Sequence, residues 1–487
     1  MSAFYIKTNR IFTPIRKYGW IFTLLVAIEG IWFPKLGLLV IPVIVSLLML
    51  SFFKGRYWCG NFCAHGSLFD SLLYPISQNR KIPSFFKSKY LIGAFFIWFS
   101  FNLIRKFIKV SALFGSMAFW DKLGFIFVAS YLMVTIAGGI LSLFISPRTW
   151  CNFCPMGSLQ RLSYKLGKLL GVAKKFDEKV TAATTEMCHT CGKCARVCPM
   201  QLTPYQEFSD KNQFDSDICI RCSTCVENCP AGILSLDTEE EAIKIKRNTD
   251  ITGYENRQKI TAVIEKITPI QDDILEYTFK FISPEKVDYN EGQFILVKIQ
   301  DNPEMYRAFS ISSYNTDSTR LSVTIKKMED GYGTNIIFDQ FKEGNKVELE
   351  GPMGRELVID KSAEKVILVA GGIGITPFKA IVKDLVKHSG NLKDFKLIYG
   401  ANYESEFIYD DEFKNLQSES NKFDYIKVVA FDENWKGKKG FVTDVMKDMD
   451  LQGYKIYMCG PKPMTDASVK VLKTMNISED EIYYESA

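Results

Sequence analysis

The chain has 487 residues, of which 47% are hydrophobic and 24% are charged, and its formal net charge at pH 7 is +5. A chain of this length fits three or four domains. The net charge is small for the length, so composition gives no support for nucleic-acid binding. Residues 1–150 are rich in apolar side chains, and the remainder has the charged texture of a soluble protein. We therefore expect a membrane part followed by soluble domains.

Four apolar stretches in the N-terminal part predict membrane-spanning helices. Residues 18–34, 36–53 and 123–147 are long enough to cross about 30 Å of hydrocarbon as helices, and residues 90–104 form a shorter candidate. The alternative is the buried core of a soluble domain, which four such stretches in so short a segment disfavour. Four spans place both ends of this part on one side of the membrane.

Basic residues flank these stretches. The positive-inside rule places such residues in the cytoplasm. They are Arg10, Arg16, Lys17, Lys54, Arg56, Arg80, Lys81, Lys87, Lys89, Arg148, Arg161, Lys165 and Lys168. Arg105, Lys106 and Lys109 break the rule, because they fall in the predicted outer loop. We expect a multi-pass protein of the inner (cytoplasmic) membrane whose soluble domains face the cytoplasm.

Two cysteine pairs follow the predicted spans. Cys59 and Cys63 come after the second span, and Cys151 and Cys154 come after the fourth. Both pairs should reach the cytoplasmic face at the same depth, where four thiolates could hold an iron–sulfur cluster. Two separate thiol pairs, buried or regulatory, are the alternative.

The segment that follows predicts a basic amphipathic helix over residues 158–175. Leucines and basic residues alternate at helical spacing, in the order Leu159, Arg161, Leu162, Lys165, Leu166, Lys168 and Leu169. A helix of this kind lies in the plane of a membrane surface.

The most specific motif in the chain, C-x2-C-x2-C-x3-C-P, occurs twice. This spacing is typical of bacterial ferredoxins with two [4Fe–4S] clusters, in which the fourth cysteine of each run ligates the other cluster. One predicted ligand set is Cys188, Cys191, Cys194 and Cys229, and the other is Cys219, Cys222, Cys225 and Cys198. Zinc would leave the third cysteine of each run unused, and disulfides suit small secreted domains. The motif predicts a two-cluster ferredoxin in a reducing compartment.

The cysteine pairs and the ferredoxin runs together resemble a family over roughly residues 10–235. This family is the four-span iron–sulfur membrane proteins of periplasmic nitrate reductase and nitrous oxide reductase systems. The chain departs from its pattern in two places: Ala64 replaces a proline after the first pair, and two residues rather than three separate Cys151 from Cys154. The resemblance implies electron exchange with a quinone or with a partner across the membrane.

Residues 258–487 resemble the ferredoxin–NADP reductase superfamily, because five motifs occur in its order. Short strands are predicted over residues 294–299 and 321–326. The motifs are the segments 307–313, 331–334, 351–354, 369–377 and 457–461. The resemblance implies FAD binding by Arg307 at the pyrophosphate, Phe309 on the isoalloxazine, Ser310 near N5, and Ser312, Gly333 and Thr334.

The same resemblance implies a nicotinamide nucleotide site and a hydride-transfer site. The nucleotide site would contain Gly371, Gly372, Gly374, Thr376, Gly460 and Pro461, with Thr376 capping a helix. Cys459 and Glu485 would lie beside the hydride path together with Ser310. The strand 396–399 is followed by Glu404 and Glu406 rather than by an arginine, which favours NADH over NADPH.

The predicted fold is therefore multi-domain, and electrons should pass along its cofactors. We expect an α-helical membrane bundle over residues 1–176, an α+β two-cluster ferredoxin over 177–247, an antiparallel β-barrel FAD domain over 257–356 and an α/β NAD-binding domain over 357–487. The predicted function is a membrane-bound NAD(P)H dehydrogenase that delivers electrons to a quinone or to a membrane or extracytoplasmic redox partner. Two alternatives remain: reverse flow that reduces NAD⁺, and a redox-sensing or maturation protein that keeps a partner's metal centre reduced.

Overall fold

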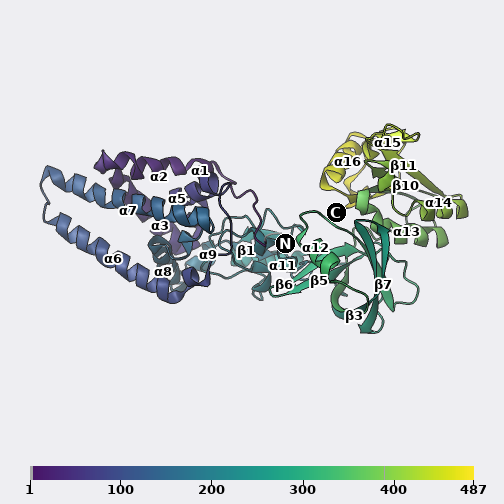
Figure 1. The fold of residues 1–487 in the computed structure, drawn as a ribbon, viewed down its shortest axis with the longest axis horizontal. Coiled ribbons are helices and arrows are strands. Elements are labelled where there is room, and N and C mark those ends of the chain that lie inside the picture. Colours follow the sequence, from purple (N-terminus) through teal and green to yellow (C-terminus); the bar gives the residue numbers. More distant parts are fainter. Residues whose placement is uncertain (1–3, 389, 487) are drawn as a thin grey trace. The chain divides into compact units, whose positions relative to one another are not determined.

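The computed structural model of the chain describes residues 4–388 and 390–486. The chain forms two compact units that divide in the sequence between Asp250 and Ile251. The first unit contains the apolar helices together with the ferredoxin segment, and the second contains two six-stranded sheets (Figure 1). The boundaries of the four predicted domains remain predictions.

Three helical segments in the described residues are long and apolar enough to cross a membrane. They are Pro34–Lys54, which comprises η2 (Pro34–Leu39) and α3 (Val40–Lys54), α6 (Lys89–Ser111) and α7 (Met117–Phe144). These segments correspond to the predicted spans 36–53, 90–104 and 123–147, and α6 extends well beyond the short stretch expected there.

The first predicted span, residues 18–34, does not form one long helix, which corrects that expectation. The chain instead forms α1 (Pro14–Tyr18), α2 (Trp20–Ala27) and a 3₁₀ turn, η1 (Glu29–Ile31). Pro34 cannot donate a backbone hydrogen bond and disfavours helical geometry at the residue before it. Phe33 accordingly has φ −120° and ψ 73°. The predicted number of membrane crossings therefore remains a prediction.

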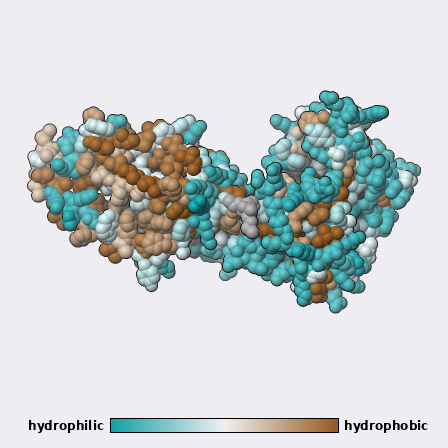
Figure 2. Space-filling model, in the orientation of Figure 1, coloured by the Kyte–Doolittle hydropathy of each residue, from teal (hydrophilic) through white to brown (hydrophobic). Residues whose placement is uncertain are grey.

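Apolar side chains are exposed along the three long helices. Figure 2 shows hydrophobic surface concentrated on the helical part of the first unit. The exposed large side chains include Ile41, Val45, Met49, Ile97, Trp98, Phe101, Ile104, Ile108, Phe125, Ile136, Ile140 and Phe144. Exposed apolar surface on this scale is unusual for a soluble monomer and marks an interaction site such as a membrane.

Short helices carry the two cysteine pairs. The first pair lies on α4 (Tyr57–Asn61) and before α5 (Ala64–Ser67), and the second pair lies on η5 (Trp150–Asn152) and before α8 (Pro155–Leu169). Helix α8 covers most of the predicted amphipathic segment. Its side chains Leu162, Leu166 and Leu169 are exposed, as an apolar helix face at a membrane surface would be.

The ferredoxin segment is a small α+β element. Strands β1 (Lys179–Ala182) and β2 (Leu234–Asp237) pair antiparallel, with α10 (Lys193–Val197) between them and α11 (Glu239–Asn248) after them. The remaining short elements of this unit are η3 (Leu68–Leu73), η4 (Ser84–Lys87), α9 (Ala173–Phe176) and η6 (Pro204–Gln206). Phe214, Ile233 and Leu234 pack with the cysteines in the core of this segment.

The second unit begins with an antiparallel sheet in the order β6-β5-β8-β3-β4-β7. Its strands are β3 (Gln258–Gln271), β4 (Ile274–Ser283), β5 (Phe294–Asp301), β6 (Glu304–Ser310), β7 (Arg320–Lys326) and β8 (Lys346–Met353), and α12 (Tyr332–Gln340) precedes β8. Ile311, the residue after β6, forms an isolated bridge to Val323 in β7. The antiparallel sheet agrees with the prediction, and its closure into a barrel remains a prediction.

The remainder of the second unit is a parallel sheet in the order β12-β11-β10-β9-β13-β14. Its strands are β9 (Lys365–Gly371), β10 (Asp394–Ala401), β11 (Phe423–Val429), β12 (Lys438–Lys439), β13 (Lys455–Gly460) and β14 (Ile482–Ser486). The other elements are η7 (Gly372–Ile375), α13 (Thr376–Lys387), η8 (Glu404–Glu406), α14 (Asp410–Glu419), α15 (Val442–Lys447), α16 (Lys462–Thr474) and η9 (Glu479–Glu481).

The alternation of side chains along β9 builds two cores on the two faces of this sheet. Val366, Leu368 and Ala370 join a core with residues of α13 and α14. Ile367 and Val369 join a separate core with residues of α15 and α16. Helices therefore cover both faces of the sheet, as the predicted α/β nucleotide-binding fold requires (Figure 1).

Candidate functional site

Twelve of the thirteen cysteines line three cavities in the first unit, four to a cavity. The membrane cavity is lined by Cys59, Cys63, Cys151 and Cys154. The two ferredoxin cavities are lined by Cys188, Cys191, Cys194 and Cys229, and by Cys198, Cys219, Cys222 and Cys225. The structure thus gathers the cysteines into the same three quartets that their spacing in the sequence predicts, including the exchange of the fourth cysteine between the ferredoxin runs.

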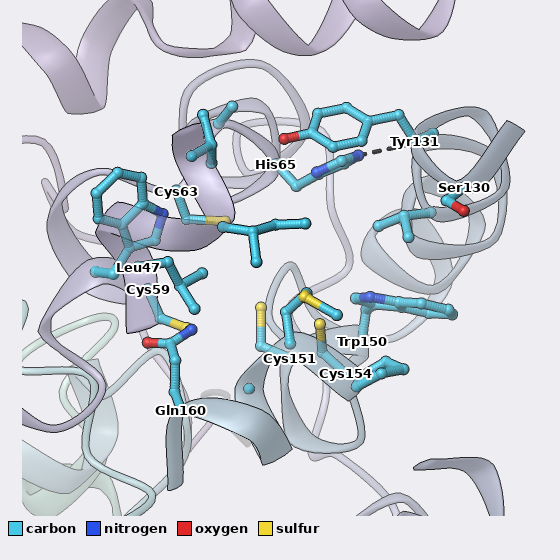
Figure 3. Close-up of a pocket in the computed structure, with 18 of the residues that line it drawn as sticks. Leu47, Cys59, Cys63, His65, Ser130, Tyr131, Trp150, Cys151, Cys154 and Gln160 are labelled. Atoms are coloured by element: carbon cyan, nitrogen blue, oxygen red, sulfur yellow. Dashed lines mark hydrogen bonds between the residues drawn. The ribbon is translucent and has the colours of Figure 1, made fainter. Parts of the chain in front are cut away.

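The cysteine quartet of the membrane cavity lies at one end of an apolar chamber. Figure 3 shows the sulfur atoms of Cys63, Cys151 and Cys154 directed toward a common space, with Gln160 beside Cys59. The chamber holds about 140 Å³, compared with about 20 Å³ in each ferredoxin cavity. Its walls come from α3, α6 and α7, the three membrane-length helices.

Hydrogen-bond donors surround the sulfur atoms of this quartet. Gln160 Nε2 lies 3.1 Å from Cys59 Sγ, and Arg56 Nη2 lies 3.7 Å from the same sulfur. Arg148 Nη1 lies 3.7 Å from Cys151 Sγ. The backbone N–H of Gly66 donates to Cys63 Sγ at 3.4 Å. Donors of this kind stabilise thiolates and the clusters that thiolates hold.

The thiols of the quartet resist ionisation without a compensating positive charge. Burial and the neighbouring Cys59 and Cys151 thiolates raise the pKa of Cys63 to about 12. Burial and Cys151 raise the pKa of Cys154 to about 11. A metal centre removes the thiol protons because its charge stabilises the thiolates. The quartet therefore has the chemistry of a site that is completed by a cationic metal group.

A buried cationic cluster adjoins the quartet. Arg16 Nη2 and Arg148 Nη2 bind Asp70 Oδ2 at 2.8 and 2.6 Å, and Arg10 lies 4.0 Å from the same carboxylate. These arginines and Arg56 are at most 3% exposed. Four positive charges against one carboxylate leave three in excess. Within the described residues, the Nε atoms of Arg10, Arg16 and Arg56 have no hydrogen-bond partner.

This excess is itself a test of whether an anionic group fits the site. Buried charges are strongly unfavourable unless they are paired. Four thiolates on a [4Fe–4S]²⁺ core would carry a net charge of about −2, which would offset most of the excess. The donors and charges at the quartet therefore suit an iron–sulfur cluster.

The quartet is in direct contact with the ferredoxin segment. Arg56 Nη1 lies 3.4 Å from the carbonyl oxygen of Ile218, and Asn61 Nδ2 donates to the carbonyl oxygen of Arg221 at 3.1 Å. Gly60 approaches so closely that a Cβ atom built on it would lie 2.0 Å from the carbonyl oxygen of Ile220. Glycine is thus required where the cysteine loop meets the second ferredoxin run.

Within the ferredoxin, one buried arginine, Arg221, is paired with one buried acid, Asp177. Arg221 binds Asp177 through Nε at 2.7 Å, and both side chains are 2% exposed. Cys198 lines the same cavity as Cys219, Cys222 and Cys225 of the second run. Burial followed by Cys222 raises the pKa of Cys198 to about 12. Among the described residues, no three His, Cys, Asp or Glu side chains could hold a single metal ion. A cluster differs from such a site, because each of its irons takes its own cysteine.

The predicted FAD residues lie at the end of β6 and the start of α12. Arg307 on β6 packs against Gly333 on α12, where an added Cβ would come within 2.6 Å of Arg307 Nε. Phe309 and Ser310 are half-buried. Ser312 is buried and donates to the carbonyl oxygen of Ser322 at 3.1 Å, so its hydroxyl already serves the sheet.

The predicted nucleotide residues lie at the carboxyl ends of the neighbouring strands β9 and β13. Gly374 packs on the end of β13, where an added Cβ would lie 2.3 Å from the carbonyl oxygen of Cys459. An added Cβ on Gly371 or on Gly460 would come within 2.4 or 2.6 Å of the Met464 side chain, respectively. Thr376 does not cap α13, contrary to expectation, because the helix begins at Thr376 and its N-cap is Ile375, without a side-chain cap.

Cys459 and Glu485 lie side by side. They are paired residues on the parallel strands β13 and β14. Burial followed by repulsion from Glu356 raises the pKa of Glu485 to about 8. Burial followed by Glu485 raises the pKa of the Cys459 thiol. The predicted hydride-path residues are therefore neighbours in a largely desolvated place.

Sequence reasoning missed the residues that support the membrane quartet. Asp70 and Gln160 were not singled out, and Arg10, Arg16, Arg56 and Arg148 were interpreted only as cytoplasmic flanking charges. The signal that could have drawn attention to Arg56 and Arg148 is their identical position, three residues before the first cysteine of each pair.

Four family models match separate parts of the chain. An oxidoreductase NAD-binding domain matches residues 368–470, and an oxidoreductase FAD-binding domain matches residues 261–356. A 4Fe-4S dicluster domain matches residues 187–233. A 4Fe-4S binding domain matches residues 36–83 and again residues 127–173, the two segments that contain the membrane cysteine pairs.

Similar proteins include reductase components of oxygenases. The propane 2-monooxygenase reductase component of Mycolicibacterium goodii is 24% identical over 61% of this chain and 85% of its own length. The phenol 2-monooxygenase reductase component DmpP of Pseudomonas sp. (strain CF600) is 32% identical over 37% of this chain and 52% of its own length. The toluate 1,2-dioxygenase electron transfer component of Pseudomonas putida is 26% identical over 49% and 68%, respectively.

Among solved structures, a ferredoxin reductase in carbazole 1,9a-dioxygenase is similar with a TM-score of 0.42. It is 24% identical and covers 47% of this chain and 69% of its own length. The matches to the family models and relatives establish that the chain has FAD-binding, NAD-binding and [4Fe–4S] ferredoxin domains. It is an NAD(P)H-dependent iron–sulfur flavin oxidoreductase.

Proposed function

We propose that this NAD(P)H-dependent iron–sulfur flavin oxidoreductase is a membrane-bound dehydrogenase that passes electrons from NADH to a quinone or to a redox partner in or beyond the membrane. FAD, two ferredoxin clusters and a third cluster at the membrane cysteines carry the electrons. The observation that carries this proposal is the close contact of the membrane quartet with the second ferredoxin run inside one compact unit.

The third cluster is supported by two independent observations. The buried arginines around the quartet need an anionic partner, and four thiolates on an iron–sulfur core provide one. The 4Fe-4S binding domain model also matches both segments that supply the quartet. We assign Cys59, Cys63, Cys151 and Cys154 as its ligands, beside the two ferredoxin ligand sets predicted from spacing.

The flavin links a two-electron donor to one-electron carriers. NADH gives up a pair of electrons as hydride, and FAD, when bound, accepts the pair and releases its electrons singly. Arg307, Gly333 and Thr334 would hold the FAD phosphates, because a forked cation and a helix N-terminus both bind such groups. Phe309 would cover the flavin ring, with Ser310 near its reactive nitrogen.

The NAD-binding part would deliver hydride beside Cys459 and Glu485. Gly371, Gly372 and Gly374 allow the nucleotide to approach the backbone, and Gly460 and Pro461 turn the chain after β13. Glu485 is largely desolvated and its pKa is raised to about 8, so it remains protonated near neutral pH.

Membrane attachment is supported by three membrane-length helices and their exposed apolar side chains. The exposed leucines of α8 would rest on the lipid surface. We place the ferredoxin and flavin parts in the cytoplasm, because that compartment supplies NADH and keeps cluster thiolates reduced.

A quinone is the acceptor that the membrane cavity supports. The same cluster type would occupy all three cavities, yet this one holds about 140 Å³ rather than about 20 Å³. Val40 and Leu47 line it on α3 and lie about 10 Å apart along the helix. Phe127 and Val134 on α7 complete an apolar wall that suits a lipid-soluble ring.

A second candidate function follows from the relatives. Because several of them are reductase components of oxygenases, a protein partner could take the electrons in place of a quinone. Anaerobic NADH oxidation by detergent-purified protein separates the two cases. Turnover with a soluble quinone analogue alone supports the quinone. Activity that requires a second polypeptide supports the protein partner.

A further inference from the structure

We infer that Arg56, Arg148 and Gln160 make the membrane cluster the most easily reduced of the three clusters, so that electrons run from the ferredoxin toward the membrane. This inference rests on the third cluster of the proposed function. It adds the order of the cluster reduction potentials, which neither the motifs nor the cofactors determine.

Side-chain donors surround two sulfur atoms of the membrane quartet. Reduction potentials of iron–sulfur clusters depend on net charge, on hydrogen bonds to the sulfurs and on solvent exposure. Cys59 Sγ has two side-chain donors, Gln160 Nε2 at 3.1 Å and Arg56 Nη2 at 3.7 Å, and Cys151 Sγ has Arg148 Nη1 at 3.7 Å. Each donor favours the extra negative charge that reduction brings.

The buried charge at the quartet acts in the same direction. Arg56 and Arg148 are buried and lie against its sulfur atoms. Asp70 pairs with Arg148, whereas Arg56 takes part in none of the described ion pairs. An added electron at the quartet is therefore placed next to a net positive charge. Coulomb attraction acts strongly there, because water is excluded.

At the adjoining ferredoxin site, Asp177 neutralises Arg221 through a close ion pair. Arg16 lies between the two sites, because it binds both Asp70 and the carbonyl oxygen of Cys222, so its charge favours neither site. Lys87, whose pKa burial lowers, is only half-buried and binds the carbonyl oxygen of Gln201 at 3.1 Å. Solvent screens the charge of Lys87 more than it screens the arginines of the membrane quartet. The cluster near Cys222 should therefore hold an electron less tightly.

Hydrogen bonds also connect the second ferredoxin run to the membrane quartet, between which one electron passes at a time. Arg16 Nη1 donates to the carbonyl oxygen of Cys222 at 3.1 Å, and its Nη2 binds Asp70, which binds Arg148. In the transfer, one cluster is oxidised by one electron and the other is reduced by one. No bond forms or breaks. NADH is the source of the electrons, and the quinone or redox partner accepts them.

The test is a redox titration of the full-length holoprotein in detergent, followed by EPR, with iron content measured on the same samples. About twelve irons per chain would show three four-iron clusters. The signal absent from the Cys63→Ser variant identifies the membrane cluster. We expect it to have the highest midpoint potential of the three.

Variants then test the residues. Arg56→Gln should lower the equilibrium constant for reducing the membrane cluster at least tenfold. For one electron, this corresponds to a potential lowered by at least about 59 mV. Gln160→Leu removes a hydrogen bond without changing charge and should lower the potential by less. Arg161→Gln is the matched control, because Arg161 pairs at the surface with Asp217 at 3.5 Å. In this variant the potential of the membrane cluster should not change.

The outcomes separate the two proposals. About eight irons per chain would remove the third cluster and overturn both. About twelve irons with the membrane cluster at or below the ferredoxin potentials would overturn the proposed order of potentials and leave the third cluster standing. The same holds if neither Arg56→Gln nor Gln160→Leu shifts its potential. If Arg56→Gln loses the cluster, Arg56→Lys and Gln160→Leu decide the question by their potentials.

Discussion

Arg16 reaches from the start of the chain to the second ferredoxin run, where its Nη1 atom donates to the carbonyl oxygen of Cys222 at 3.1 Å. The same side chain binds Asp70 through Nη2 at 2.8 Å. One arginine thus joins the cysteine-bearing membrane segment to a cluster-binding loop more than two hundred residues away. A change that disrupts either the membrane quartet or the ferredoxin should therefore destabilise both.

The contact at Gly60 gives a direct test of that dependence. Gly60→Ala would place a Cβ atom 2.0 Å from the carbonyl oxygen of Ile220, so backbone must shift. We expect a loss of about 1–3 kcal/mol of stability and reduced iron content, measured by thermal unfolding and iron analysis. Gly93→Ala on α6 is the control, because nothing lies within 4 Å of its Cβ. Equal effects of the two changes would contradict the contact.

Asp70 should be the most sensitive carboxylate of the first unit. Asp70→Asn leaves Arg16 and Arg148 buried without their acid, which should cost about 3–5 kcal/mol. Asp215→Asn removes ion pairs to Lys168 and Lys179 at a half-exposed side chain and should cost less than about 1 kcal/mol. Denaturant unfolding in detergent measures both. A loss at Asp70 no larger than at Asp215 would refute the buried network.

The same carboxylate predicts an acid dependence. Burial opposes ionisation, but Arg148 and Arg16 outweigh it and hold the pKa of Asp70 well below its usual range. An acid with a depressed native pKa stabilises the fold above its unfolded pKa, and this stability is lost as pH falls toward the native value. Stability should therefore decline below about pH 4, and Asp70→Asn should flatten that decline.

Glu485 predicts the opposite dependence in the second unit. Its pKa is raised from 4.5 to about 8, so between these values the native state keeps a proton that the unfolded state has lost. The unfolding free energy should therefore fall as pH rises from 4.5 to 8. Glu485→Gln removes this dependence. Unfolding free energies of the wild type and of Glu485→Gln, each with and without flavin, measure it across this pH range. Identical slopes of unfolding free energy against pH in the wild type and the variant would contradict the raised pKa.

Nucleotide choice can be tested at the turn after β10. Glu404→Arg replaces an acid with a group that can bind a 2′-phosphate. It should raise the NADPH-to-NADH ratio of kcat/KM by at least about tenfold, because one charged hydrogen bond contributes about 1.5–3 kcal/mol. Flavin reduction rates with each nucleotide give the ratio. A wild-type protein that already prefers NADPH would refute the assignment.

Local spacing was sufficient for much of this architecture. The two cysteine runs predicted the two ferredoxin groupings, because ligand spacing is fixed by the cluster rather than by distant packing. The grouping of the membrane cysteines was expected from the place of each pair after a predicted span. The strands around Arg307 and Cys459 were likewise predictable from turn motifs and short apolar runs. The antiparallel and parallel sheets of the second unit were expected from the family resemblance that the five ordered motifs of residues 258–487 carry.

Tertiary contacts account for what the sequence did not reveal. Arg10 and Arg16 resemble ordinary cytoplasmic flanking charges, and only the folded chain shows that they surround Asp70. The apolar stretch over residues 18–34 has the composition of a span, yet the chain turns before Pro34. Composition measures the hydrophobicity of a segment and does not determine where its backbone breaks.

The proposed function requires that electrons from NADH reach the membrane quartet within one polypeptide. Anaerobic full-length protein can be mixed with NADH and frozen at successive times for EPR spectroscopy. We predict that the signal dependent on Cys63 appears after the flavin is reduced, without any added protein. A reduced flavin and ferredoxin with no such signal would contradict it, as would a flavin that NADH and NADPH both fail to reduce.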